Sequence, residues 1–484
     1  MAAPSRERWS KEFSRWFDWV LEEAEIYDYG RYPVKGMGVW RPYGFQIRRR
    51  VVDLIRSVLD ASGHEEVLFP LLIPEHLLRK ESEHVRGFEA EVYWVTHGGR
   101  EPLDVKLALR PTSETSISYM ESFWIKSYRD LPRLFYQVVS IFRYETKATR
   151  PLIRLREVTT FKEAHTVHDS FEDADRQVEE AIGLYKRIFD ELGIPYVISK
   201  RPEWDKFAGA VYTVAFDTVM PDGRVLQIGT VHHLGQNFTI PFEVRFQRRD
   251  ELIDYAWQTS YGLSDRVIAT LIAIHGDDRG PVLPPNVAPI QVVVIPIPAR
   301  SEEDTARVEK ALNELEERLR EAGIRYRVDR REDVRPGRKY YEWEARGVPV
   351  RIELGPREAR EGSLVLVRRD TLEKRKVEAS RVQEELEKLF EEIRSELRNR
   401  AWKWLETKVR RVETVEEARK ILEEERGIVE LPWCGRQECG LRLEEMVEAG
   451  VLGSPLEKPE WVKGRRCPVC GQPAVTSIRV AKKY

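Results

Sequence analysis

A proline-rich segment at residues 281–286 divides the chain into two stretches with different patterning. Proline cannot continue a helix or donate to a sheet ladder, so this segment is the strongest linker signal in the sequence. Beyond it, strand-like and helix-like stretches alternate, which predicts a small α/β domain. At about 150 residues per domain we expect roughly three domains. Their expected boundaries are 1–283, 284–400 and 401–484.

The composition is that of a globular protein. Apolar residues make up 42% of the chain, charged residues 33%, and the formal net charge is -2. Since there is no overall positive field, any contact with nucleic acid must come from local patches. No apolar run approaches the roughly 20 residues of a membrane span, and the first residues lack the apolar core of a signal peptide. We therefore expect a cytoplasmic protein without membrane contact.

The local patterns predict individual helices and strands. Apolar residues at helical spacing, and stops such as Ser62-Gly63, indicate helices. The predicted helices lie at 45–61, 172–192, 302–322 and 381–394, a further helix starts after Ser264, and a charged helical segment lies at about 396–426. The predicted strands lie at 67–73, 134–142, 152–161, 211–216, 291–296, 325–328, 350–354, 364–368 and from 477 to the last residue.

The predicted hairpin of strands 134–142 and 152–161 carries charged side chains. Arg143 and Glu145 are two residues apart and are expected to share one face, as are Arg154 and Arg156 on the returning strand. Arginine binds phosphate and carboxylate groups in a bidentate manner, so the hairpin is a candidate anion site. A solvated face with cross-strand ion pairs remains an alternative.

Three further segments carry candidate binding residues. Residues 110–114 place a hydroxyl and a carboxylate where they can hold a cationic amine, and residues 229–238 form a polar strand end next to glycine. Arg266 stands at the start of an apolar helix. Taken singly, each segment also fits a loop, a buried polar group or a helix cap.

The cysteines suggest a metal site. They form the pattern C-x4-C followed by C-x2-C near the C-terminal end, which is close to known structural zinc spacings. Four thiolates leave no open coordination position, so a Zn²⁺ ion there would be structural. Free thiols or a disulfide remain alternatives. The candidate ligands are Cys434, Cys439, Cys467 and Cys470.

Together these segments resemble the class II aminoacyl-tRNA synthetases. The helix and strand ending at Pro70 resemble the first class II motif, residues 142–145 with 154–157 the second, and residues 262–266 the third. Four other segments narrow the resemblance to the prolyl-tRNA synthetases of the archaeal and eukaryotic type; they lie at 110–114, 206–210, 229–238 and 275–280.

The resemblance implies an α+β protein: an antiparallel-sheet catalytic domain, then an α/β anticodon-binding domain and a small zinc-binding α/β domain. It implies that the chain joins proline to tRNA(Pro) with ATP and Mg²⁺, as a homodimer. The absence of a large insertion between the second and third motifs implies that no editing domain is present. A family relative without catalysis, or a class II enzyme for threonine, serine or glycine, is the alternative. The segment at 229–238 and the cysteine region argue against another amino acid.

The resemblance also implies residue roles. Arg143 would hold the α-phosphate of ATP and the proline carboxylate, and Arg154 and Arg266 the outer phosphates. Thr112 and Glu114 would bind the ring amine of proline. The proline ring would be walled by Phe161, Phe207 and His232, and the remaining ATP contacts are Glu145, Gln227 and Thr230. Many relatives have tryptophan at the position of Phe161.

Two further expectations concern the second half of the chain. The strand at 350–354 and the residues after it carry candidate contacts to guanine-rich anticodon bases, namely Arg351, Glu353 and Arg357. Arginine can donate to the acceptor atoms of guanine, and a carboxylate can accept from its amines. An ordinary charged edge strand is the alternative. The resemblance implies that Tyr484, at the end of the last strand, folds back towards the catalytic domain. A disordered tail is the alternative.

Overall fold

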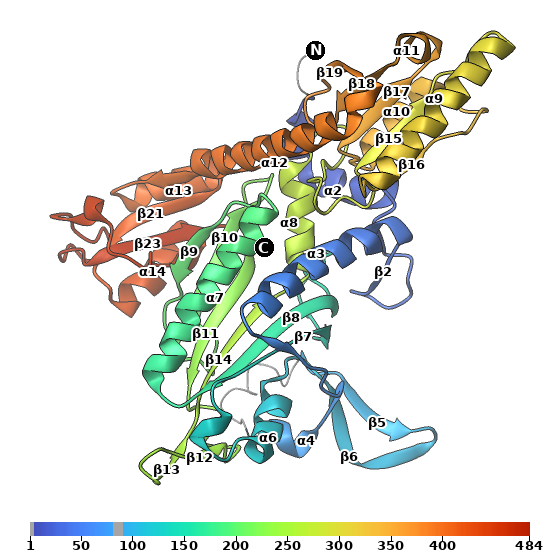
Figure 1. Cartoon of the computed structure of the whole chain (residues 1–484). Coiled ribbons are helices and arrows are strands. Elements are labelled where there is room, and N and C mark those ends of the chain that lie inside the picture. Colours follow the sequence, from blue (N-terminus) through green and yellow to red (C-terminus); the bar gives the residue numbers. More distant parts are fainter. Residues whose placement is uncertain (1–3, 81–90) are drawn as a thin grey trace.

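A seven-stranded sheet forms the centre of the first half of the chain in the computed structural model, which describes residues 4–80 and 91–484 (Figure 1). Neighbouring strands are antiparallel, except that β3 runs parallel to β7. In sheet order the strands are β3 (Glu65–Glu66), β7 (Arg133–Phe142), β8 (Glu157–His168), β14 (Trp257–Leu263), β11 (Val225–Gly235), β10 (Tyr212–Val219) and β9 (Val197–Lys200).

Helices cover one face of this sheet. The helix α7 (Phe171–Glu191) begins at Ser170, whose hydroxyl accepts a hydrogen bond from the Asp173 amide. Its apolar side chains, such as Tyr185 and Phe189, recur at helical spacing and are buried against the sheet. Helices α3 (Pro42–Ala61) and α8 (Asp265–His275) pack beside it. Successive side chains of a strand point to opposite faces, so every second side chain of each strand lies on the sheet face that these helices do not cover.

The predicted strand at 67–73 is wrong. The structure has two short strands, β3 and β4 (Leu72–Pro74), on either side of Pro70. Proline cannot donate to a ladder, which explains the break. β4 belongs instead to a three-stranded sheet with β5 (Trp94–Gly98) and β6 (Glu101–Leu109).

The second strand of the predicted hairpin is also displaced. β8 begins at Glu157 rather than at residue 152, and Leu152 has a positive φ of 57°, which interrupts an extended chain. Arg154 and Arg156 thus precede the strand instead of sharing its face, and Arg143 and Glu145 follow the end of β7 at Phe142. The helices predicted at 45–61, at 172–192 and after Ser264 are confirmed by α3, α7 and α8.

The middle of the chain forms a five-stranded mixed sheet, which confirms the predicted alternation of strands and helices. Its strands, in sheet order, are β16 (Tyr326–Val328), β15 (Val292–Pro296), β17 (Val350–Leu354), β18 (Ser363–Arg368) and β19 (Lys374–Glu378). β15 is parallel to β16 and β17. The helices are α9 (Glu302–Glu321), α10 (Pro336–Ala345), α11 (Pro356–Glu361) and α12 (Val382–Thr407).

The long helix α12 leads from this sheet to the last sheet of the chain, which we call the C-terminal sheet (Figure 1). The charged helical segment predicted at 396–426 is wrong as one unit, because a strand separates α12 from α13. In sheet order the strands are β20 (Val409–Arg411), β21 (Ile428–Trp433), β23 (Thr476–Ala481) and β22 (Gly450–Gly453). The helices are α13 (Val415–Glu424) and α14 (Gln437–Val447).

The last residues return to the seven-stranded sheet. β23 ends at Ala481 rather than at the final residue, but the Tyr484 amide donates to the Val225 carbonyl at 3.1 Å, and the tyrosine side chain packs against the main core of the seven-stranded sheet. The expected return of the chain end is confirmed.

Shorter elements complete the structure. None of the helices in the described ranges, 4–80 and 91–484, combines the length and apolarity needed to cross a bilayer. The shorter helices and strands are α1 (Glu7–Lys11), α2 (Phe13–Glu23), α4 (Glu75–Arg79), α6 (Glu114–Trp124), β1 (Tyr27–Tyr29), β2 (Gly38–Trp40), β12 (Arg245–Gln247) and β13 (Ile253–Tyr255).

Candidate active site

A pocket of about 340 Å³ lies on the sheet face opposite α7. The structure brings together in it all the residues that the sequence predicted for ATP and proline. These lining residues are Thr112, Glu114, Arg143, Glu145, Arg154, Phe161, Phe207, Gln227, Thr230, His232 and Arg266.

Strand alternation explains how residues far apart in sequence meet here. On β8, Lys162 points to the helical side, where its Nζ donates to the Tyr185 hydroxyl at 2.9 Å, so its neighbours Phe161 and Glu163 face the pocket. On β11, Thr230 also lines the pocket and pairs with Gly262 of β14. Together these strands form the floor of the site.

One end of the pocket is cationic. The Arg143 Nε donates to the Pro111 carbonyl at 3.2 Å, and the Arg266 Nε donates to the Ile153 carbonyl at 2.9 Å. Burial, together with Arg154 and Arg143, lowers the pKa of Arg266 to about 10. Arg266 also lies in the first turn of α8, where backbone amides and the helix dipole favour an anion. Three convergent guanidinium groups at one pocket end suit a polyphosphate.

The other end combines an acid with aromatic rings. The Thr112 hydroxyl donates to the Glu114 carboxylate. The Phe207 ring lies 4.9 Å from the His232 ring, measured between centroids, and is stacked on Phe238. Burial, and the charge of His165, lower the pKa of His232 to about 3, so its imidazole is neutral at neutral pH. This end suits a small apolar ring that carries a cationic amine.

The sequence analysis did not identify every polar residue of the pocket, and Glu163 and His165 on β8 are two that it missed. Glu163 accepts hydrogen bonds from Ser113 at 2.5 Å and Gln137 at 2.8 Å, and it lies 3.1 Å from the His165 ring nitrogen. Burial alone would lower the pKa of His165, but the hydrogen bond to Glu163 and the nearby carboxylates raise it. The signal available in the sequence was the alternation of Phe161, Glu163 and His165 along one strand.

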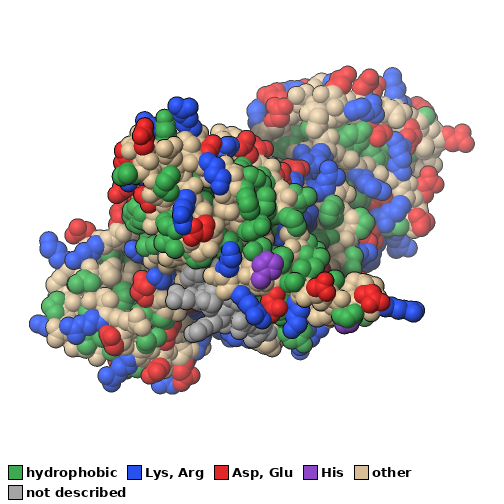
Figure 2. Space-filling model, turned by 90° about the horizontal axis from the view of Figure 1, so that it is seen from below, with side chains coloured by type: hydrophobic (Ala, Val, Ile, Leu, Met, Phe, Trp, Pro, Cys, Tyr) green, Lys and Arg blue, Asp and Glu red, His purple; other side chains and the backbone are tan. Residues whose placement is uncertain are grey.

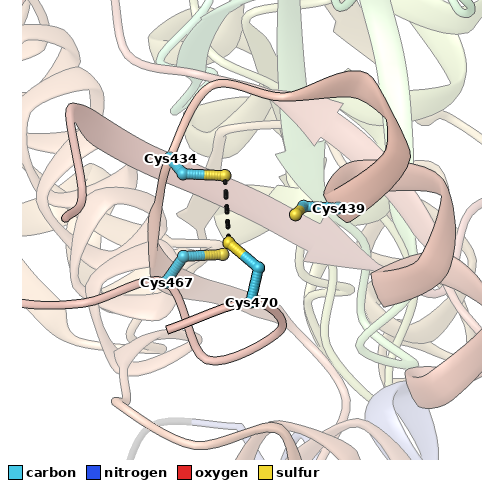
Figure 3. A group of neighbouring side chains, drawn as sticks. All are labelled: Cys434, Cys439, Cys467 and Cys470. Atoms are coloured by element: carbon cyan, nitrogen blue, oxygen red, sulfur yellow. Dashed lines mark hydrogen bonds between the residues drawn. The ribbon is translucent and has the colours of Figure 1, made fainter. Parts of the chain in front are cut away.

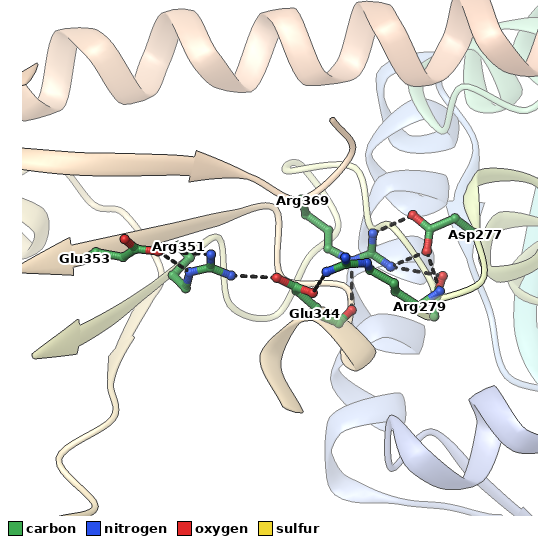
Figure 4. A network of polar contacts seen from close by, with 7 residues as sticks. Asp277, Arg279, Glu344, Arg351, Glu353 and Arg369 are labelled. Carbon is green, nitrogen blue, oxygen red and sulfur yellow. Dashed lines mark hydrogen bonds and ion pairs between the residues drawn. The ribbon is translucent and has the colours of Figure 1, made fainter. Parts of the chain in front are cut away.

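Outside the pocket, the predicted anticodon residues take part in ion pairs, and Figure 4 shows those of Arg351 and Glu353. The buried Arg351 of β17 donates to Glu344 at 2.7 Å and to Glu353 at 3.0 Å, and its guanidinium lies 3.9 Å from the Tyr340 ring centroid. Arg357 lies on α11, is exposed, and pairs with Glu361 at 3.0 Å. The structure therefore brings Arg351 and Glu353 together and gives Arg357 a different partner.

The four cysteines converge, as Figure 3 shows. Their sulfur atoms all lie within 4.8 Å of one another, and no disulfide joins them. Cys439 lies in α14, and the other three lie in loops that flank β21 and β23. A tetrahedral ion with bonds of about 2.3 Å holds its ligands roughly 3.8 Å apart, so the cluster fits Zn²⁺.

Comparisons with known families agree with this arrangement. Residues 93–275 match the model of the "tRNA synthetase class II core domain (G, H, P, S and T)", and residues 291–389 match the "Anticodon binding domain". Residues 415–484 match "Prolyl-tRNA synthetase, C-terminal". The fold and the site thus define a class II aminoacyl-tRNA synthetase, an ATP-dependent ligase.

Comparisons over the full length of the chain point to one family within this class. The chain is 66% identical to a proline–tRNA ligase of Aeropyrum pernix over 100% of both chains. It is 61% identical to that of Sulfurisphaera tokodaii over 99% of both. The solved structure of Giardia lamblia prolyl-tRNA synthetase in complex with prolyl-adenylate matches with a TM-score of 0.95 and 36% identity, covering 100% of each chain. The chain belongs to the prolyl-tRNA synthetase family.

Proposed function

We propose that the chain activates L-proline with ATP to give prolyl-adenylate and pyrophosphate, and then transfers proline to the 3′ end of tRNA(Pro). The single observation that carries this proposal is the division of one pocket into a triple-arginine end and an acid-and-aromatic end. The likeness to a synthetase solved with prolyl-adenylate supports it.

The first step needs charge stabilisation rather than a nucleophilic side chain. The proline carboxylate attacks the α-phosphorus, and the bond from that phosphorus to the bridging oxygen of pyrophosphate breaks. Arg143 would contact both reacting anions, and Arg154 and Arg266 the departing phosphates. Mg²⁺ would accompany ATP and neutralise part of its charge, and Glu145 is one pocket carboxylate that could offer an oxygen ligand.

The amino-acid subsite would select proline by charge and shape. Glu114 and Thr112 would hold the ring amine, while Phe161, Phe207 and the neutral His232 would enclose the ring. Gln227 and Thr230, on β11, would contact adenosine. In the second step the terminal ribose hydroxyl of the tRNA would attack the prolyl carbonyl, and AMP would leave.

An apolar surface supports a homodimer. The Phe69 ring lies 5.8 Å from the Trp124 ring, so the segment around Pro70 is continuous with α6. Hydrophobic side chains gather on the face that Figure 2 displays. Such a surface is costly in water and is typical of an interface. The exposed apolar residues of the two segments are Leu68, Leu71, Leu72, Tyr119, Phe123 and Trp124.

The remaining roles belong to the second half of the chain. Arg351, Glu353 and Arg357 are proposed to read anticodon bases of tRNA(Pro), for which Arg351 would exchange a carboxylate partner for a guanine. The cysteine cluster is proposed to hold one structural Zn²⁺ ion. The proposed domain limits stay at 1–283, 284–400 and 401–484, and the proposed location is the cytoplasm, where translation takes place.

The variant Arg143→Ala tests the proposal. It should fold normally but lose proline-dependent exchange of pyrophosphate into ATP by about 10²-fold or more, since one charge-stabilising donor contributes that much in comparable sites. Arg56→Ala is the matched control, because Arg56 pairs with Glu66 on the surface, outside the pocket. Near-normal exchange by Arg143→Ala would contradict the assigned role.

A further inference from the structure

Arg201 is a buried cation in the pocket wall with no role assigned so far. It follows β9, and 3% of its side chain is exposed. Its two terminal nitrogens donate to the two Asp217 oxygens, each at 2.8 Å, in a bidentate pair with β10. Although burial opposes the charged form, Asp217 keeps the pKa of Arg201 above its ordinary value. Arg201 is therefore a fixed guanidinium, not a mobile surface side chain.

The same guanidinium makes two further contacts, one on each side. Nη2 donates to the Gln227 side-chain oxygen at 3.1 Å, and Nη1 donates to the Leu452 carbonyl of the C-terminal sheet. The backbone carbonyl of Gln227 accepts from Arg266 Nη1 at 3.3 Å. Gln227 thus contacts Arg201 through its side-chain amide and Arg266 through its backbone carbonyl, and Arg201 in turn contacts the C-terminal sheet.

The contact with Gln227 has a defined polarity. Arginine has only donors, so the Gln227 amide must turn its oxygen towards Arg201. Its NH₂ group then points away from Arg201 and is available as a donor to an acceptor in the pocket. Without Arg201 the amide is free to flip or rotate, which weakens any hydrogen bond that depends on its orientation.

The Leu452 carbonyl is itself held in place. Lys200 and Ser454 exchange two backbone hydrogen bonds, at 2.8 and 3.0 Å, across the contact between β9 and the C-terminal sheet. Gly453, which lies between Leu452 and Ser454 in the chain, has a φ of 109°. A Cβ at this position would lie 2.0 Å from the Lys200 carbonyl oxygen. Only glycine permits this close approach. The C-terminal sheet is thereby docked next to the Arg201 side chain.

We propose that Arg201 is a positioning residue through which the C-terminal sheet shapes the nucleotide subsite, because it fixes the Gln227 amide with its donor group towards the adenosine of ATP. This inference rests on the proposed function in one respect, that ATP binds in this pocket. It predicts that substitution of Arg201 weakens the binding of ATP much more than the binding of proline.

A double-mutant cycle on the full-length protein tests the inference. The variants are Arg201→Lys, Gln227→Ala and the double variant, and Lys is chosen because it keeps a positive charge beside Asp217. ATP dissociation constants are measured by calorimetry without amino acid, next to KM values for ATP and proline in pyrophosphate exchange. Each single variant should weaken ATP binding about tenfold, with the KM for proline within about twofold of wild type. The double variant should bind ATP no more weakly than Gln227→Ala alone.

Arg479→Met is the matched control. Arg479 belongs to the same junction, where it pairs with Glu430 and donates to the Ile198 carbonyl and the Ser199 hydroxyl, but it does not line the pocket. It should lower the melting temperature and leave the ATP dissociation constant unchanged. If Arg201→Lys proves unstable, Arg201→Met combined with Asp217→Asn removes both buried charges and serves in its place.

Three results overturn the inference: unchanged ATP binding in Arg201→Lys, additive losses in the double variant, or equal losses for ATP and proline. An absence of proline-dependent exchange in the wild type would instead contradict the proposed function. In that case the calorimetric ATP cycle still decides the role of Arg201.

Discussion

The pair of Arg369 and Asp277 joins the five-stranded sheet to the end of α8, and its removal should be costly (Figure 4). The two nitrogen–oxygen distances are 2.5 and 2.8 Å, and 1% of each side chain is exposed. Arg369 Nε also donates to the Glu344 carbonyl at 2.8 Å. The variant Arg369→Met keeps similar bulk but leaves the Asp277 carboxylate buried without its cation.

Breaking a buried pair by removing one partner generally costs about 3 to 5 kcal/mol. We expect the free energy of unfolding to fall towards the lower end of that range, because the Arg279 amide still donates to Asp277 at 2.8 Å. Adding Asp277→Asn to Arg369→Met should recover part of the loss, since neither member of the pair then carries a charge. Arg357→Met should change little, because its partner Glu361 is in solvent contact and Arg357 is 73% exposed.

Urea unfolding, followed by tryptophan fluorescence, measures these differences. The transition that reports the five-stranded sheet should shift to lower urea in Arg369→Met without a change in slope, and it need not coincide with the unfolding of the other sheets. If Arg369→Met unfolds at the same urea concentration as Arg357→Met, the buried pair does not stabilise the fold. A double variant that is less stable than Arg369→Met alone would also contradict the prediction.

Three further predictions follow from other parts of the structure. Protein purified without added zinc should contain one Zn²⁺ per chain, and chelation should unfold the C-terminal sheet; metal-free protein with four reactive thiols would overturn the site. Deletion of Tyr484, whose ring lies 5.3 Å from the Arg150 guanidinium and 5.5 Å from that of Arg224, should weaken proline activation, and wild-type kinetics for proline, ATP and tRNA would contradict this. Burial lowers the pKa of His64 to about 4 and of His275 to about 3. Because the unfolded chain binds these protons first as the pH falls through about 6.5, stability should be lost from about pH 6.5 down to the folded pKa values of about 4 and 3, by up to roughly 1.4 kcal/mol per pH unit per histidine. A flat urea midpoint over that window would contradict it.

Much of the fold could be predicted because local patterns agree with tertiary packing. Helices such as α7, with apolar residues at helical spacing and a serine cap, lie where the sequence placed them. The errors fall where local and tertiary preferences differ. Pro70 splits one apolar run between two sheets, and the left-handed Leu152 delays the start of β8. Neither effect is visible in hydrophobic periodicity.

The pocket was predictable only through resemblance to a family, because its residues come from strands and loops far apart in sequence. All the predicted ATP and proline residues line it, whereas Glu163, His165 and Arg201 were missed. Arg201 depends on a contact between β9 and the C-terminal sheet, more than two hundred residues away in the chain. No local motif encodes such a contact.

The most direct test of the whole account is amino-acid-dependent exchange of labelled pyrophosphate into ATP by the wild-type protein. We expect exchange with proline, and little or none with threonine, serine or glycine at the same concentration, because these lack a ring to fill the site of Phe207 and His232. Exchange that is absent with proline, or faster with one of the other amino acids, would contradict the assignment of the pocket.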